Sequence, residues 1–504
     1  MSSTPRRGPG LCMVSLGTVT TFLAAWNSLA VLVVLGPRPH VSVAVLVGIA
    51  AAFDAAAAVA VGAGTVWSGR VGSRTALASG SAVFALACAG CALASGPLLV
   101  AARTVQGIAA ALMVAAALEA LSGPTGRGEP CGGDGFQTAG VGATLVCGPL
   151  VAGAVAAVHG WRWVFWAEAI VGAGICCVVL VLVRGGRGAS AAAARDDDGG
   201  AAITAAVSVS VSAADRTPRP RDRFDLPALA FATVAVAGPI GALTEAAASG
   251  WGDVRTLALL AAGLVALVPI LVWHTPPGAL YSRAFVAAQV ADLCLFAATA
   301  GTLFLLAQYF HAVAGSGSLG VGLRIVPWSA AVAVALSASA SAQARARGMR
   351  RLMAAGLALD AVGLLGLAAA VRGRQTGWWL AVSLVLSGAG VGLAMPAARR
   401  AAVTVAGLRQ PEGAVGGLGA VRWAGAGLGI ALLGAVLAAR GGIGSAAADR
   451  GAGPAVAAAA LVAALVAAAG AAAALTLPTR ERPPMVPVFS RTQHDGPGPS
   501  SRRT

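Results

Sequence analysis

Residues 135–165 read GFQTAGVGATLVCGPLVAGAVAAVHGWRWVF, and this stretch decides the fold. It predicts an apolar helix, a short loop, and a second helix that opens on Trp161 and Trp163. Small residues recur along the first helix at mostly helical spacings: Gly135, Ala143, Gly148, Ala152 and Gly153. A face of small residues lets another backbone approach closely in lipid, where packing replaces the hydrophobic effect as the force that joins helices. Pro149 removes a backbone donor and bends the helix, and the tryptophans suit a membrane–water interface. These properties indicate a kinked, closely packed transmembrane helix.

The composition extends this interpretation to the whole chain. Of 504 residues, 58% are hydrophobic and 11% are charged, and the mean hydropathy is +0.81. These values exclude an ordinary soluble domain and indicate many membrane spans. The net charge of +16 would suit a nucleic-acid partner. However, the arginines lie in loops and tails between apolar runs, which favours membrane orientation and no nucleic acid.

The eight cysteines lie mostly inside apolar runs. Cys88 and Cys91 form a C-x-x-C, but no histidine or second cysteine pair stands near them in the sequence. We therefore expect no metal site and no cofactor, and we expect these thiols to serve as small packing residues.

Fourteen apolar runs are long enough to predict spans. Their approximate ranges are 11–35, 41–64, 75–94, 98–121, 136–157, 163–183, 226–243, 256–273, 285–310, 325–342, 352–371, 378–395, 414–439 and 455–475. The first run is about 25 residues long, too long for the core of a signal peptide. Gly238-Pro239 interrupts the seventh run.

The arginines predict the orientation. An even number of spans places both ends on one side, and with the N-terminus inside, roughly 25 of the 35 arginines fall in cytoplasmic segments. We expect a multi-pass protein of the plasma membrane with both termini cytoplasmic. The polar segments 184–225 and 478–504 are expected to be a disordered cytoplasmic linker and tail.

Charged residues within the spans should carry the function. Arg103 lies inside the fourth run, where an arginine costs roughly 2.5–3.5 kcal/mol on insertion scales, so it should face a cavity or a partner. The alternative is an arginine that snorkels to the outer surface. Acids lie in five other places within the runs: Asp54, Glu119, Glu168, Asp292 and Asp360. Each is either a functional residue that lines a cavity or a paired structural residue.

Short sequence motifs indicate which family of membrane proteins the chain resembles. The G-P-x-x-A-G at Gly148–Gly153 resembles the antiporter motif of the major facilitator superfamily, in which we include Gly135. With the following G-W-R-W-V-F, the region resembles the fourteen-helix drug:proton antiporters of the EmrB/QacA type. The resemblance implies an all-α polytopic fold with two six-helix bundles, residues 1–183 and 275–477, and an inserted helix pair, residues 226–274.

Two further motifs carry this resemblance. The R-x-x-Q-G-x-x-A-A of the fourth run resembles motif B, through Arg103, Gln106 and Gly107, which implies a role for Arg103 in proton transfer. Residues 65–74 resemble a degraded cytoplasmic loop motif, and the positions that fit are Arg70, Gly72 and Arg74. Gly69 stands where the family carries an aspartate, and Asn27 stands where the first span often carries an acid. The family's charge relay in this loop is therefore in question.

The expected function is proton-coupled efflux of amphipathic or cationic small molecules by alternating access, without enzymatic activity. The resemblance implies the substrates and export, and the lack of a visible ATP-binding motif indicates the proton gradient as the energy source. We hypothesise that Asp54 exchanges the proton while Arg103 modulates that step, with Asp360, Asp292 and Glu168 as further candidates. The partners are then a small molecule, protons and lipid, and we expect a monomer. Two alternatives stay open: a proton-linked importer or metabolite carrier on the same fold, and a degenerate membrane protein that does not transport.

Overall fold

A computed structural model describes residues 43–122, 133–193, 226–270, 283–312, 314–343, 349–373, 377–405, 411–440 and 452–477. Within these ranges the chain is helical, and every expected run from 41–64 onward corresponds to one helix. The first expected run, Asn27, most of the 184–225 linker and the tail from 478 lie outside the described residues.

The helices follow the chain in a simple order. They are α2 (Val43–Val71), α3 (Ser73–Leu93), α4 (Gly96–Ser122), α5 (Gly133–His159), α6 (Arg162–Ala193), α8 (Leu226–Ser249), α9 (Val254–Pro269), α10 (Arg283–Ala312), α11 (Ser318–Gln343), α12 (Met349–Arg372), α13 (Trp378–Val405), α14 (Pro411–Ala439) and α15 (Ala452–Leu475).

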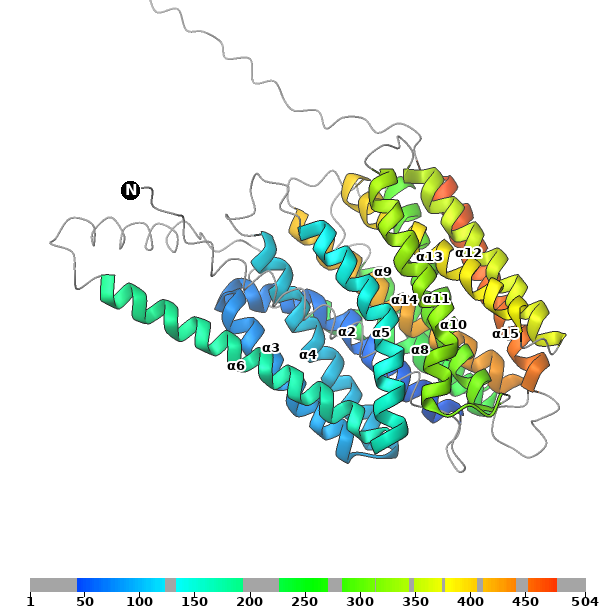
Figure 1. The fold of residues 1–504 in the computed structure, drawn as a ribbon, viewed down its shortest axis with the longest axis horizontal. Helices are drawn as coiled ribbons and strands as arrows, with labels where there is room; N and C mark the ends of the chain where they lie inside the picture. The colour runs from blue at the N-terminus through cyan, green and yellow to red at the C-terminus, as the bar shows by residue number, and fades with distance from the viewer. Residues whose placement is uncertain are drawn as a thin grey trace, which may run out of the picture.

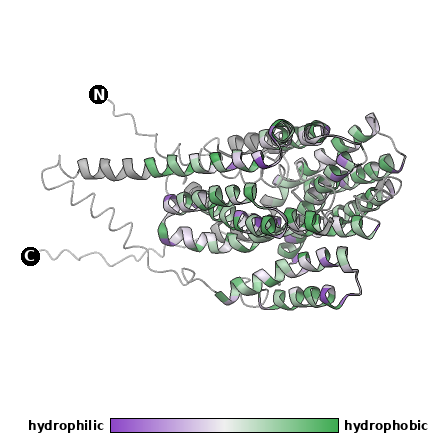
Figure 2. Cartoon of the chain, turned by 90° about the horizontal axis from the view of Figure 1, so that it is seen from below, coloured by the Kyte–Doolittle hydropathy of each residue, from purple (hydrophilic) through white to green (hydrophobic). Residues whose placement is uncertain are grey.

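Among the described residues, 11 helices are long and apolar enough to cross a membrane, and two shorter apolar helices cover Ala143–His159 and Val254–Pro269. Hydrophobic residues, in green, occur along the whole length of the helices (Figure 2). In lipid, this composition suits helices that contact both protein and acyl chains. The expectation of an all-helical, multi-pass membrane protein is confirmed.

Several helices extend beyond the expected runs; α6 and α13 each end ten residues later than expected, and α8 contains the expected interruption. Helix α6 continues to Ala193, ten residues beyond the expected end at Val183 and through three glycines, because no proline stops it and four of its last five residues are alanine, the best helix former. Helix α8 passes through Gly238-Pro239 without ending. Here the glycine and proline serve packing, since a Cβ on Gly238 would lie 2.8 Å from the Leu259 carbonyl oxygen of α9, and Pro239 contacts Gly263 of the same helix.

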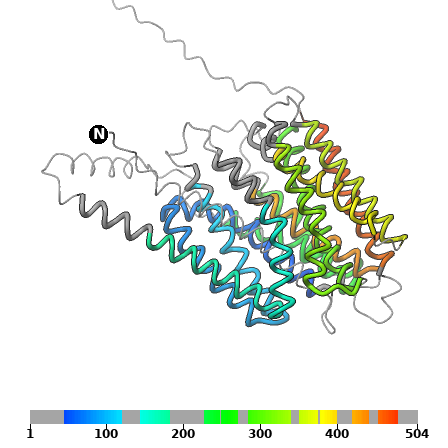
Figure 3. Tube along the Cα trace, viewed as in Figure 1, coloured from blue at the N-terminus to red at the C-terminus, as the bar shows by residue number. Residues whose placement is uncertain are grey.

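The helices form two groups (Figure 1). In the first, α4 packs on α2 and α3, and α6 packs on α3. In the second, α13 packs on α11 and α12, and α15 packs on α12 and α10. The groups meet along two seams, the α2–α14 seam and the α5–α11 seam. The trace of α5 runs beside that of α11 (Figure 3). The hairpin of α8 and α9 lies along the α2–α14 seam, because α8 contacts both of its helices.

The two groups share one packing detail that reveals a repeat. Gly107 of α4 lies against the carbonyl of Phe53 and the methyl of Ala56, both on α2. In the second group, Gly388 of α13 lies in the same way against Trp328 and Ala331 of α11. The contacted residues are three positions apart in both cases, so α2 and α4 correspond to α11 and α13. Internal repeats of this kind are typical of membrane transporters.

Candidate transport site

Arg103 forms the centre of a polar cluster in the first group. Its side chain is fully buried in α4. Nε donates a hydrogen bond to the Ile49 carbonyl oxygen of α2 at 3.3 Å, and Nη1 donates to Gln106 Oε1 at 2.8 Å. The guanidinium also lies over the Phe53 ring, 4.6 Å from its centroid. The arginine therefore faces protein partners and does not snorkel to the surface.

Gln106 connects Arg103 to a carboxylate on another helix. Its Nε2 donates to Glu168 Oε2 of α6 at 3.1 Å, and Glu168 is 2% exposed. The same amide contacts two thiols of α3: Nε2 lies 3.0 Å from Cys88 Sγ, and Oε1 lies 3.7 Å from Cys91 Sγ. The cysteines were expected only to fill space, yet both sulfurs touch this amide. We call Arg103, Gln106, Glu168, Cys88 and Cys91 the Gln106 network.

Asp54 lies beside this network, at the α2–α14 seam. Its side chain is 2% exposed, and a Cβ placed on Gly427 of α14 would lie 3.5 Å from the Asp54 Cβ. Asp54 follows Phe53 on α2, and the Phe53 ring underlies the Arg103 guanidinium. The structure therefore brings Asp54 and Arg103 into one neighbourhood. A hydrogen-bonded path also leads from Arg103 through Gln106 to Glu168.

Asp292 belongs to a second cluster. Arg422 Nε of α14 donates to Asp292 Oδ2 of α10 at 2.9 Å, and Asp292 is fully buried. The Arg422 guanidinium lies over the Phe296 ring, 5.0 Å from its centroid. Sequence reasoning missed Arg422, although an arginine inside an apolar run is the same signal that pointed to Arg103.

An aromatic pair joins these two clusters across the α2–α14 seam. The rings of Phe53 and Trp423 lie 5.2 Å apart at 46°. Phe53 also contacts Arg103, and Trp423 follows Arg422 in the chain. A change in how α2 and α14 meet must therefore move an aromatic contact that includes Phe53, which borders Arg103, and Trp423, which is next to Arg422 in the chain.

Asp360 lies in a third cluster, within the second group. Ser387 Oγ of α13 donates to Asp360 Oδ1 of α12 at 2.6 Å, and Trp328 Nε1 of α11 donates to Ser387 Oγ at 3.3 Å. Ser387 precedes Gly388 as Gln106 precedes Gly107. Gln106 on α4 and Ser387 on α13 therefore occupy equivalent positions of the repeat. Each of them donates a hydrogen bond to a buried carboxylate, Glu168 in the first group and Asp360 in the second.

The antiporter motif lies at the other seam. Gly148 and Pro149 are buried within α5, and Gly135 lies near the start of that helix. A Cβ on Gly153 would lie 2.6 Å from the Ser318 carbonyl oxygen of α11, and a Cβ on Gly322 would lie 2.5 Å from the Pro149 carbonyl oxygen. The small residues of the motif therefore allow backbone-to-backbone contact between the two groups.

The loop motif joins α2 to α3. Gly72 adopts φ +83°, which glycine tolerates without strain, while Arg70 and Arg74 are exposed. One turn earlier, Ser68 donates a short hydrogen bond to Glu119 near the end of α4. This contact fastens the end of α2 to α4 at a loop where the family's aspartate is replaced by Gly69.

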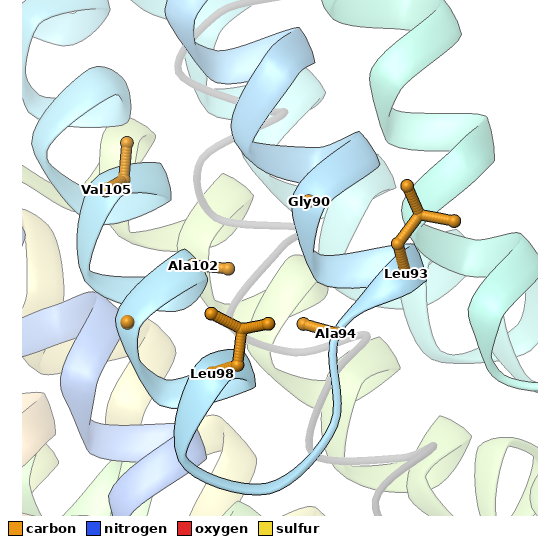
Figure 4. A pocket seen from close by; sticks show the side chains of 7 residues that line it. Gly90, Leu93, Ala94, Leu98, Ala102 and Val105 are labelled. Carbon is orange, nitrogen blue, oxygen red and sulfur yellow. The ribbon is translucent and has the colours of Figure 1, made fainter.

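The groove between the end of α3 and the start of α4 is not a polar site (Figure 4). Its lining contains only glycine, alanine, leucine and valine, and Leu93, Leu98 and Val105 are exposed. In a membrane this surface faces acyl chains, so we place no substrate there.

Two helical groups that repeat one another, meet at two seams and bury charges beside them are the arrangement of a membrane transporter. Residues 14–349 match the family model of the Major Facilitator Superfamily. The chain belongs to this superfamily.

Curated relatives agree with this assignment. The chain is 27% identical over 387 residues to the methylenomycin A resistance protein of Bacillus subtilis, covering 74% of this chain and 76% of the relative. It is 28% identical over 371 residues to the multidrug resistance protein Stp of Mycobacterium tuberculosis, covering 71% and 63%. It is 26% identical over 388 residues to the tetracenomycin C resistance and export protein of Streptomyces glaucescens, covering 74% and 65%.

Solved structures match the fold. A POT family transporter in complex with 5-aminolevulinic acid aligns with a TM-score of 0.60 at 14% identity, over 91% of this chain and 95% of that one. The peptide transporter POT in complex with sulfate aligns with a TM-score of 0.59 at 17% identity, over 95% and 98%. At these identities the likeness concerns the fold alone.

Proposed function

We propose that the chain exports small molecules across the cell membrane in exchange for protons. The observation that carries the proposal is the buried Gln106 network, in which an arginine and a carboxylate on different helices share one amide, with Asp54 beside them at a seam. Intramembrane charges of this kind typically mark proton or substrate pathways. The similarity to resistance and export proteins supports efflux over uptake.

Proton coupling would operate through the carboxylates. A protonated carboxyl group is neutral and a deprotonated one is attracted to Arg103, so the two forms favour different arrangements of α2, α4 and α6. Asp54 is the first candidate because it lies at a seam whose packing must change when the two groups rock. Glu168, Asp360 and Asp292 are the other candidates.

The proposal also covers the transported molecule and the orientation of the chain in the membrane. The transported molecules are amphipathic or cationic, as the resemblance implies, and the relatives' names refer to antibiotics and drugs. We propose the fourteen-helix subtype, with residues 11–35 as the additional span, a location in the plasma membrane, and a monomer with both termini cytoplasmic.

The direction of transport tests the proposal. Inside-out vesicles that contain the chain should accumulate a fluorescent dye such as ethidium when a pH gradient, acidic inside, is imposed. A protonophore should abolish the accumulation, because no gradient then remains to drive it. Uptake that is equal in vesicles without the chain would contradict export. Accumulation only in right-side-out vesicles, with the gradient reversed so that the outside is acidic, would identify a proton-linked importer.

The topology has its own test. Single cysteines introduced at Ser210 and Ser490, in a cysteine-free background, should resist membrane-impermeant thiol reagents in intact cells and react after permeabilisation. The reason is that an even number of spans with an internal N-terminus places both segments in the cytoplasm. Labelling of either cysteine from outside would overturn the fourteen-span arrangement.

A further inference from the structure

The Asp292–Arg422 pair leaves polar atoms unused. Among the described residues, Asp292 Oδ1, Arg422 Nη2 and Gln289 Oε1 are buried without a hydrogen-bond partner. Gln289 precedes Asp292 by three positions on α10, so the two side chains share one face of that helix. One unused donor nitrogen thus lies on α14, and two unused acceptor oxygens lie on one face of α10, which packs on α14.

The geometry of the pair explains why these atoms are free. A guanidinium matches a carboxylate best through two parallel hydrogen bonds. Here the contact is single, from Nε to Oδ2, so the second donor and the second oxygen remain available. Asp292 is fully buried, whereas the Arg422 side chain is 20% exposed. The Arg422 side chain therefore reaches from its buried contact with Asp292 to a partly exposed position.

An aromatic ring borders the same position. Phe296 lies one turn after Asp292 on α10 and underlies the Arg422 guanidinium. The site thus combines polar atoms with a flat apolar wall. This combination is typical of small-molecule sites, in which a few polar groups fix the orientation of a mostly apolar ligand.

We propose that Arg422, Asp292 and Gln289 form a subsite for a primary carboxamide, or an equivalent neutral group, of the exported molecule. The proposal rests on the proposed function and specifies its substrate. The carbonyl oxygen accepts from Arg422 Nη2, and the two N–H groups donate to Asp292 Oδ1 and Gln289 Oε1. All three unused atoms are then satisfied, which relieves the penalty that buried unpaired polar groups carry.

Charge favours this occupant over an ion. Asp292 and Arg422 already neutralise each other, so an added cation or anion would leave a net charge in a low-dielectric site. The subsite therefore favours a neutral group over a charged one at this position of the exported molecule. In this assignment Asp292 is a positioning residue that holds Arg422 for the ligand.

Binding to the purified full chain in nanodiscs tests the subsite. The probes are 2-naphthamide, its N,N-dimethyl derivative and (2-naphthyl)trimethylammonium, measured by thermal shift and tryptophan fluorescence. The wild type should bind 2-naphthamide at least about tenfold more tightly than either other probe, since these lack the two N–H donors or carry a charge. Arg422→Gln should remove this preference, and Arg324→Gln, at an exposed arginine of α11, should retain it. Equal binding of the three probes, or no binding of 2-naphthamide, would overturn the subsite.

A second variant separates binding from folding. Replacing the pair in Asp292→Leu/Arg422→Met should leave the unfolding temperature unchanged or higher, because apolar residues often replace a buried ion pair without loss of stability. The amide preference should disappear. A clear fall in unfolding temperature would show a structural pair and contradict the proposal. If the wild type binds the amide but vesicles show no gradient-driven transport, the proposed function fails while the subsite stands.

Discussion

Asp54→Asn is expected to abolish uphill, proton-driven efflux while substrate binding and downhill exchange persist. The amide keeps the shape of the side chain at the α2–α14 seam but cannot gain or lose the proton. Without that step, the pH gradient has no means of biasing the two arrangements of the helical groups. The measurement is dye accumulation in inside-out vesicles under an imposed pH gradient, compared with counterflow in the same vesicles without a gradient.

A variant of Arg103 and a control variant on α8 complement the test of Asp54. Arg103→Lys should reduce coupled efflux by about tenfold rather than abolish it, because lysine keeps the charge but loses the planar fork. In the native protein that fork donates to both Ile49 and Gln106. Glu245→Gln is the matched control, since Glu245 accepts a hydrogen bond from Ser249 on the exposed part of α8. It should pump as the wild type does.

One outcome would reassign the coupling residue. If Asp54→Asn pumps as fast as the wild type, Asp54 is structural, and Glu168 becomes the next candidate because Gln106 links it to Arg103. Asp360 would follow, since its hydrogen-bond donor is the neutral Ser387. Asp292 comes last, because Arg422 already holds it in an ion pair.

Gly153→Leu is expected to stop transport without removing the protein from the membrane. A Cβ at this position would lie 2.6 Å from the Ser318 carbonyl oxygen and 3.1 Å from the Leu319 Cα, and a leucine adds three more carbon atoms. Backbone atoms cannot rotate away as a side chain can, so α5 and α11 must separate at this end of the seam. Each group folds through contacts of its own, so the variant should still insert into the membrane. The two groups should, however, be unable to close against each other where Gly153 of α5 meets Ser318 of α11.

The control for Gly153 lies on the neighbouring helix. Gly174 of α6 is exposed, and a Cβ there would meet nothing within 4 Å. Gly174→Leu should therefore leave efflux and membrane level unchanged. Gly148→Leu, within the same motif, should act in the same direction as Gly153→Leu. Normal efflux by both motif variants would remove the role that the antiporter-motif resemblance implies for this segment.

The local pattern of the chain accounts for the helices and the family. A membrane span is defined by about 20 consecutive apolar residues, which is a property of neighbours in sequence. The runs from residue 41 onward therefore anticipated each described helix. Motifs such as G-P-x-x-A-G and R-x-x-Q-G-x-x-A-A are equally local, so they indicated the superfamily before any contact was known. Arg103 was correctly singled out because a charge inside an apolar run is conspicuous by itself.

Contacts between side chains that are far apart in the sequence could not be predicted from local patterns. Glu168 meets Gln106 across 62 positions, and Arg422 meets Asp292 across 130, so no local pattern could pair them. The role of Gly238-Pro239 in α8 is similar: the sequence marks an interruption, while the packing against α9 makes it a contact surface. Sequence alone determined that this chain crosses the membrane many times, and it marked Arg103 and the buried acids, although not Arg422, as charges inside the spans. Only the tertiary structure decided which charges share a site, because helix packing in lipid depends on the shapes of facing surfaces that are distant in the chain.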